Sequence, residues 1–181
     1  MKFLVLAAAA ALLSACSSFE VAQPDPKTGL IETSTKATTI INKKVDLDSR
    51  KALLLVQNDP FVVGQTKALN YFTDIINTEQ LETAIIQANL TDKVPTVRER
   101  IGINNAAKNY KPFLWLRFDI DDTKREYVQM YLTDPLNMED LFAAEVYMDT
   151  VWAGVNDQNA WYPLFNELIT YIRANSATYG K

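Results

Sequence analysis

The most regular pattern of apolar and polar residues lies near the end of the chain and predicts an amphipathic helix. Its apolar positions recur at i, i+3, i+4, i+7, i+8 and i+11, and they are Trp161, Leu164, Phe165, Leu168, Ile169 and Ile172. Proline is tolerated only in the first turn of a helix, so Pro163 places the start of this helix around residues 159–162. A stripe of this regularity is typical of a helix that packs against a sheet.

Over residues 113–152 the side chains instead fall into two alternating sets, a period of two that predicts three β-strands in a meander. In the first strand the two alternating sets are Leu114, Leu116, Phe118 and Ile120, and Phe113, Trp115, Arg117 and Asp119. A short polar turn leads to a second alternating run over 127–132, and the two runs together predict a β-hairpin. The third strand is predicted over 141–152.

Shorter elements are predicted between residues 51 and 111. The apolar run over 51–56 and the segment 74–76 predict two short strands. Helices are expected near 61–72, after Asn77 and after Thr96, because Asn77 with Gln80 and Thr96 with Glu99 have the spacing of a capping box. The predicted order is β-α-β-α-α-β-β-β-α. It defines an α/β (α+β) fold, a two-layer mixed sheet with a C-terminal β-meander and a closing amphipathic helix.

The polar segment before residue 50 keeps no regular period. Its richness in Thr, Ser, Lys and Pro over 17–48 predicts a flexible tether. An alternative is that 38–45, which contains two isoleucines, adds an edge strand to the folded domain. The predicted division is a signal segment over 1–15, a lipidated cysteine and tether over 16–49, one globular domain over 50–175 and a C-terminal tail over 176–181.

The first sixteen residues have the organisation of an export signal. Lys2 is followed by an apolar run from Phe3 to Leu13 and then by small residues. As a helix this run would span roughly 17 Å, about half the apolar thickness of a bilayer. It is therefore too short to cross a membrane.

The end of this signal resembles the lipobox of bacterial lipoproteins, with Leu13, Ser14, Ala15 and Cys16 in the matching positions. The resemblance implies that a signal peptidase recognises residues 13–15 and cuts before Cys16. It also implies a diacylglyceryl group on the Cys16 sulfur and an acyl chain on its nitrogen. Ser17, rather than Asp, follows the cysteine directly. In this respect the chain resembles lipoproteins that are sorted to the outer membrane of Gram-negative bacteria. The alternative is an ordinary secretory signal with an incidental cysteine.

Composition excludes several kinds of chemistry. The chain has no histidine and its one cysteine is Cys16, so Ser-His-Asp and Cys-His catalysis, HExxH zinc sites and disulfides are not expected. The formal charge is −4. An acidic chain is a poor ligand for nucleic acid, which is not expected as a partner. No cofactor is expected beyond the covalent lipid on Cys16.

Two groups of residues remain as weaker candidates for a site. Asp119, Asp121 and Asp122 could bind a hard cation or supply paired carboxylates, although aspartates at this position are more typical of a turn. The aromatic residues Trp115, Trp152, Trp161 and Tyr162 could form a binding platform, although the periodic patterns place most of them in the core. Trp152 and Tyr162 are retained as a candidate partner surface.

The order of elements behind the lipobox resembles the TolB-N-like or CsgG-like domains of envelope lipoproteins, which have an anticodon-binding-like α/β fold. The likeness is carried by 51–56, 72–81, the hairpin 113–132 and the segment 159–166. It implies a protein that acts mainly by binding.

We therefore expect a lipid-anchored, periplasm-facing outer-membrane module that is not an enzyme and that serves as a binding or adaptor protein. Its partner would be an envelope protein in cell-wall synthesis or secretion, or a second copy of the chain. The alternatives are an envelope glycan hydrolase that uses paired carboxylates and a carrier of a small ligand.

Overall fold

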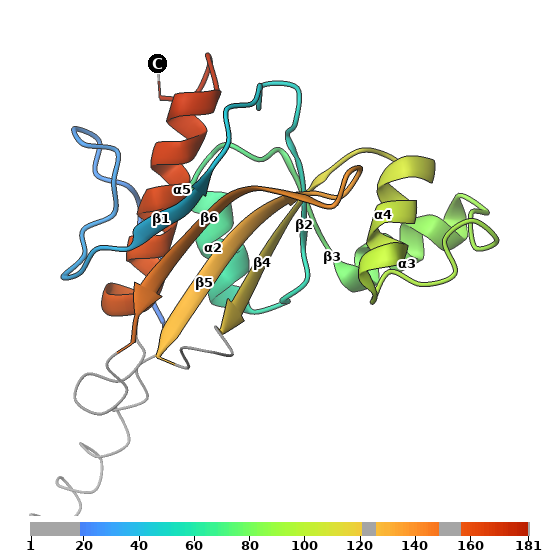
Figure 1. Ribbon diagram of the computed structural model, residues 1–181, viewed down its shortest axis with the longest axis horizontal. Coiled ribbons are helices and arrows are strands. Elements are labelled where there is room, and N and C mark those ends of the chain that lie inside the picture. The colour runs from blue at the N-terminus through green and yellow to red at the C-terminus, as the bar shows by residue number, and fades with distance from the viewer. Residues whose placement is uncertain (1–18, 121–125, 149–156, 181) are drawn as a thin grey trace, which may run out of the picture.

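The computed structural model describes residues 19–120, 126–148 and 157–180, which contain one six-stranded mixed sheet (Figure 1). The strands are β1 (Thr38–Asn42), β2 (Ala52–Leu55), β3 (Asp74–Asn77), β4 (Leu114–Ile120), β5 (Tyr127–Asp134) and β6 (Glu139–Tyr147). The helices are α2 (Pro60–Ala68), α3 (Thr78–Gln87), α4 (Arg100–Asn109) and α5 (Tyr162–Asn175), the last preceded by the π-turn η1 (Asp157–Trp161). The α/β fold class expected from the sequence is confirmed, and its order of elements runs from β2 to α5.

The spatial order of the strands is β1-β6-β5-β4-β2-β3. β2 is parallel to both β3 and β4, because helical crossovers connect them. β4, β5 and β6 form the predicted antiparallel meander, and β1 pairs with the outer edge of β6. Strand β6 covers 139–147 where 141–152 was predicted, and the end of that prediction lies outside the described residues.

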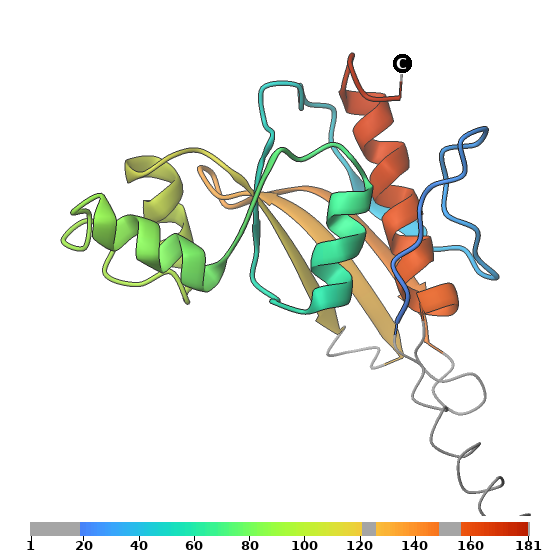
Figure 2. The same cartoon turned by 180° about the vertical axis from the view of Figure 1, so that it is seen from behind.

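Two apolar clusters lie on opposite faces of the sheet. Helices α2 and α5 cover one face, where the inward residues of β2, β4, β5 and β6 join the stripe of α5 in the main core (Figure 2). Helices α3 and α4 form a smaller cluster with Leu54 on β2 and with Phe113 and Trp115 at the start of β4. The other face of the sheet is therefore covered by helices only around β2, β3 and the beginning of β4.

Of the two predicted capping boxes, the one at Asn77 is confirmed and the one at Thr96 is wrong. Helix α3 begins with the predicted capping box, in which the Asn77 side chain accepts from the Gln80 amide (2.8 Å) and the Gln80 side chain accepts from the Asn77 amide (2.9 Å). The predicted box of Thr96 with Glu99 is wrong, because α4 begins at Arg100 and Glu99 makes no side-chain cap. The Thr96 hydroxyl instead accepts locally from the Arg98 amide (3.2 Å).

The prediction of a flexible tether is wrong for residues 19–49. Ile31 and Leu47 lie in the main core, and the alternative of an edge strand is confirmed by β1. Two amide side chains bind the backbone of the segment in both directions: Gln65 at Ala22 (2.9 and 2.8 Å) and Asn166 at Ile31 (2.7 and 2.8 Å). Hydrogen bonds to its backbone hold this segment, so its sequence needs no regular apolar period. Its composition therefore resembles that of a flexible coil.

The predicted C-terminal tail also belongs to the folded domain as far as residue 180. The Ser176 hydroxyl donates to Asp48, and the Tyr179 hydroxyl donates to the Leu69 carbonyl oxygen (2.8 Å). The Tyr179 ring packs edge-on against Tyr71, with ring centroids 5.4 Å apart. The globular unit in the described residues thus extends from residue 19 to residue 180.

Candidate functional site

No helix in the described residues covers the outer side of β5, β6 and the second half of β4, which faces the viewer in Figure 1. The alternation of each strand sends one set of side chains into the core and the other to this side. The outward set is polar and aromatic, and we call it the open face: Arg117, Asp119, Gln129, Tyr131, Asp140 and Glu145. Because no helix of the described residues covers this face, its polar groups contact either water or a binding partner.

Arg117 is the centre of the open face. Its guanidinium donates to Asp119 on the same strand and to both oxygens of Asp140 on β6 (3.3 and 3.2 Å). The same guanidinium lies over the ring of Tyr131, 3.9 Å from the ring centroid. Only 13% of the Arg117 side chain is exposed, so these partners replace most of its water.

A chain of hydrogen bonds extends this centre across β5 and β6. The Thr133 hydroxyl donates to Asp140 (2.5 Å). The Tyr131 hydroxyl donates to the Gln129 side-chain oxygen (2.6 Å), and the Gln129 amide donates to Glu145 (3.2 Å). Three of the charged side chains are carboxylates and one is a guanidinium, so the open face carries an excess of negative charge.

Two buried donors beside this network have no partner within the described residues. They are the Trp115 indole nitrogen and the Arg117 Nε. Two guanidinium groups lie near the Trp115 ring, that of Arg117 at 5.6 Å and that of Arg100 at 5.8 Å from its centroid. Each unsatisfied buried donor costs free energy, which the ion pairs and ring contacts of the network must offset.

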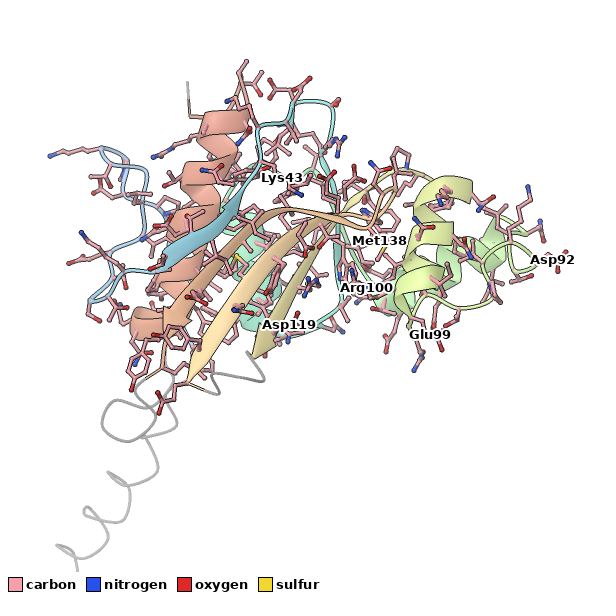
Figure 3. All side chains as sticks on the ribbon, viewed as in Figure 1. Lys43, Asp92, Glu99, Arg100, Asp119 and Met138 are labelled. Atoms are coloured by element: carbon pink, nitrogen blue, oxygen red, sulfur yellow. The ribbon has the colours of Figure 1, made fainter. Side chains whose placement is uncertain are left out.

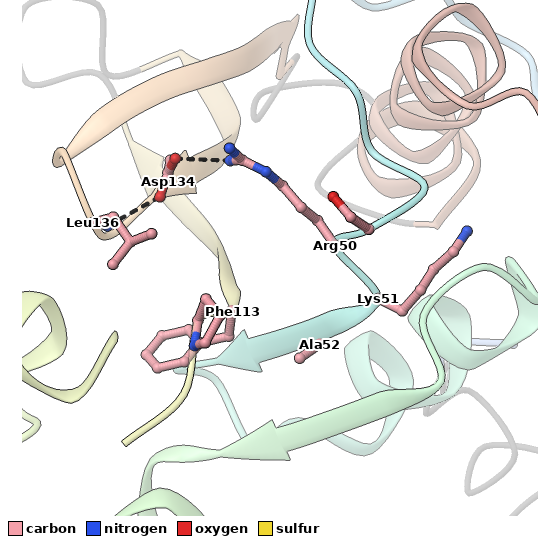
Figure 4. Close-up of a pocket in the computed structure, with 8 residues that line it drawn as sticks. Arg50, Lys51, Ala52, Phe113, Asp134 and Leu136 are labelled. Carbon is pink, nitrogen blue, oxygen red and sulfur yellow. Dashed lines mark hydrogen bonds and ion pairs between the residues drawn. The ribbon is translucent and has the colours of Figure 1, made fainter. Parts of the chain in front are cut away.

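A separate pocket of about 360 Å³ opens where β2 begins (Figure 4). Arg50 spans it to form an ion pair of 2.7 Å with the buried carboxylate of Asp134, which also accepts from the Leu136 amide (3.0 Å). Phe113 and Leu136 supply apolar walls. The charged groups in the pocket satisfy one another, and this ion pair joins the start of β2 to the turn after β5.

A tyrosine beside this pocket has a perturbed pKa. The Lys51 ammonium lies over the Tyr71 ring, 3.4 Å from its centroid, and the Tyr71 hydroxyl donates to the Leu47 carbonyl oxygen (2.5 Å). Burial, followed by the nearby charge of Asp48, raises the pKa of Tyr71 to about 12. The hydroxyl therefore stays protonated and keeps its hydrogen bond throughout the neutral range.

The residues that the sequence predicted for a site do not come together within the described residues. Asp119 has half of its side chain exposed and pairs with Arg117, while Asp121 and Asp122 lie outside the described residues. The expectation that Tyr162 belongs to a partner surface is wrong: it is 3% exposed, because α5 turns it into the core, and its hydroxyl donates to the Glu20 carbonyl oxygen (2.5 Å). Trp152, Cys16 and residues 13–15 also lie outside the described residues.

Neither a metal cluster nor a membrane-spanning helix occurs within 19–120, 126–148 and 157–180. That range contains no group of three or more acidic, histidine or cysteine side chains placed to hold an ion. None of its helices combines the length and the apolar character that a membrane crossing needs.

The alternating pattern of residues 113–120 places Arg117 on one face of a strand but indicates no role for it. The available signal was a lone basic residue in an otherwise apolar and aromatic run, flanked by Trp115 and Asp119. Its partner Asp140 lies on a different strand, 23 residues away, so only the pairing of β4, β5 and β6 could reveal the network.

Comparisons of the chain with models of known protein families, with curated proteins and with solved structures find no match.

Proposed function

We propose that this chain is a lipid-anchored, periplasm-facing binding module of a bacterial outer membrane, which acts as an adaptor for an envelope protein. The anchor rests on the lipobox resemblance of Leu13, Ser14, Ala15 and Cys16 and on Ser17. Adaptor activity in cell-wall synthesis or secretion rests on the resemblance to TolB-N-like and CsgG-like domains. The observation that supports binding best is the open face.

The open face has the composition of a protein-binding surface. Tyrosine and arginine are among the residues that contribute most to protein interfaces, and Tyr131 and Arg117 lie together here. Their side chains are held by ion pairs and stacking before any partner arrives, so little conformational entropy is lost on binding. A rigid polar face is suited to recognition of a specific partner.

The charge of the open face indicates the chemistry of the partner. Asp119 and Asp140 pair with Arg117, and Glu145, which binds Gln129, adds a third carboxylate to the face. A partner that presents Lys or Arg side chains beside an apolar or aromatic group would complement this arrangement. We therefore propose a basic segment of an envelope protein as the ligand.

Photo-crosslinking in living cells tests this function. A photoreactive amino acid at Gln129 on the open face should capture an envelope protein, whereas the same probe at Asp92 in the exposed turn after α3 should not. The double variant Asp119→Lys with Glu145→Lys reverses the charge of the face and should abolish the Gln129 adduct. Glu82→Lys with Asp92→Lys is the matched control and should leave the adduct intact.

Two outcomes of the crosslinking experiment would overturn the proposal. Equal capture from positions 129 and 92, or an adduct that survives the charge reversal, would show that the open face does not recognise the partner. A thermal melt of each variant shows whether the domain has kept its fold, so loss of binding is not confused with loss of structure.

A further inference from the structure

One end of the molecule gathers aromatic side chains from six separate segments. The Phe19 ring contacts Phe61 at the start of α2 (5.4 Å between centroids) and Trp161 before α5 (6.4 Å), and Trp161 contacts Phe118 on β4 (5.1 Å). Tyr127 and Tyr147, at the beginning of β5 and the end of β6, pair at 5.4 Å. We call this group the aromatic end; it is the end at which β2, β4 and β6 finish and α2 and α5 begin (Figures 1 and 2).

The aromatic end exposes apolar surface to its surroundings. Phe19, Val56 and Tyr147 are 42%, 43% and 50% exposed. A groove of about 410 Å³ opens beside them, between Phe19, Phe61 and Trp161. Aromatic side chains with one apolar and one polar part are enriched where proteins meet the headgroup layer of a membrane.

The length of chain between the lipid and the aromatic end is very short. Only Ser17 and Ser18 separate Cys16 from Phe19, so the two α-carbons are at most about 11 Å apart. Residues 19–49 pack on the domain and add nothing to this reach. The coil expected from the sequence, about thirty residues long, would have allowed a root-mean-square reach of roughly 30 Å.

From this short link we infer that the aromatic end rests in the headgroup layer of the membrane that holds the Cys16 lipid, and that the domain has a fixed orientation there. The inference rests on the lipid anchor of the proposed function. Helix α5 starts at this end and has 14 residues, so its C-terminal end points away from the membrane by about 21 Å. Asp119 of the open face lies near this end of the sheet (Figure 3).

The charges at the aromatic end decide what kind of contact this is. Glu20, Asp59 and Glu126 are exposed there. They would be repelled by anionic lipid, so the contact depends on the aromatic groups and on the short link rather than on charge. We therefore expect the same orientation on zwitterionic phosphatidylcholine and on mixtures of phosphatidylethanolamine with phosphatidylglycerol.

Quenching by headgroup-labelled lipid tests the orientation. Because Cys16 is acylated, Gln57→Cys at the aromatic end and Ala177→Cys beyond α5 each supply a unique thiol for a fluorophore. Full-length lipidated protein in vesicles with nitroxide-labelled headgroups should show several-fold stronger quenching at position 57 than at position 177. Both vesicle compositions should give this result.

An insertion provides the matched control. A Gly/Ser segment of about thirty residues between Ser18 and Phe19 restores a reach of roughly 30 Å without changing the lipobox or the packed domain. Quenching at positions 57 and 177 should then become nearly equal.

The outcomes separate this inference from the anchor on which it rests. Equal quenching of the two labels in the uninserted protein, while it floats with the vesicles, would overturn the fixed orientation and leave the anchor intact. Unequal quenching that persists after the insertion would overturn the short link as its cause. Protein that does not float with vesicles would overturn the lipid anchor, and with it the orientation.

Discussion

At the scale of single residues, the network around Arg117 shows how a sheet face can be polar and still ordered. Its guanidinium has charged partners on two sides and an aromatic ring beneath it, so each group restricts the others. The same principle joins the segment before β2 to the residues after α5 at Asp48. That carboxylate accepts from the Ser176 hydroxyl, the Thr178 hydroxyl (2.8 Å) and the Ala177 amide (2.8 Å).

The bonds to Asp48 predict a loss of stability in acid. The Ser176 hydroxyl, then the Thr178 hydroxyl and the Ala177 amide, lower the pKa of Asp48 from its ordinary 3.8 to about 2. A lowered pKa in the folded state adds stability that is complete above pH 3.8 and disappears as the pH falls through about 2. Asp48→Asn should therefore destabilise the protein at pH 7, and the difference from the wild type should shrink between pH 4 and pH 2.

Urea unfolding at several pH values measures this effect. Asp92→Asn, in an exposed turn, serves as the control and should leave the acid dependence of the wild type unchanged. A destabilisation by Asp48→Asn that is the same at pH 7 and pH 2 would show that the carboxylate charge does not contribute.

At the scale of elements, the position of α4 depends on one glycine. A Cβ on Gly102 would lie 1.9 Å from the Thr96 carbonyl oxygen, so the segment before the helix folds back against its first turn only because Gly102 has no side chain. This contact also explains why the helix begins at Arg100 rather than near Thr96. Helix propensity by itself would favour alanine at this position.

Gly102→Ala should consequently destabilise the protein, even though alanine favours a helix by about 1 kcal/mol. The clash is with backbone, which cannot rotate away, and overpacking of this kind costs about 1–3 kcal/mol or more. Gly64→Ala is the matched control in α2, where the new Cβ would meet only a methyl group of the half-exposed Val21, at 2.6 Å. Thermal unfolding should show a clearly larger loss for Gly102→Ala, and an equal or higher melting temperature than the wild type would contradict the steric argument.

At the scale of the whole molecule, the segment 19–49 changes how the domain relates to its proposed anchor. Arg173 near the end of α5 donates to the Thr28 and Gly29 carbonyl oxygens (both 2.9 Å), and Gln65 and Asn166 bind further points of the same segment. The segment is thus part of the domain, and the contact of Phe19 with Phe61 fixes where the chain enters it.

The anchor itself leads to a prediction about localisation. Two or more acyl chains give stable membrane attachment, whereas a protein without them has only weak contacts with lipid. Cys16→Ser should therefore shift the protein from the detergent-rich to the aqueous phase in detergent phase separation, or leave it unprocessed with its signal. Ser17→Ala is the matched control and should leave the protein in the detergent-rich phase. Processed Cys16→Ser protein that still partitions with detergent would contradict lipidation.

The sequence by itself was sufficient for the elements whose periods are local. The stripe of α5, the alternation of β4 and β5 and the capping box at Asn77 depend on neighbours within a few residues, and all three are confirmed. These elements also determined the fold class, because each apolar face requires a partner layer.

Tertiary structure decided the features that depend on contacts between distant residues. The segment 19–49 is held by amide side chains and strand pairing 43 to 135 residues away, which leave no apolar period in a local window. The Arg117 network likewise exists only because β4, β5 and β6 place side chains from separate strands on one face. Local periods can reveal which faces are buried, but only packing shows which polar groups meet and how far the domain lies from its proposed lipid anchor.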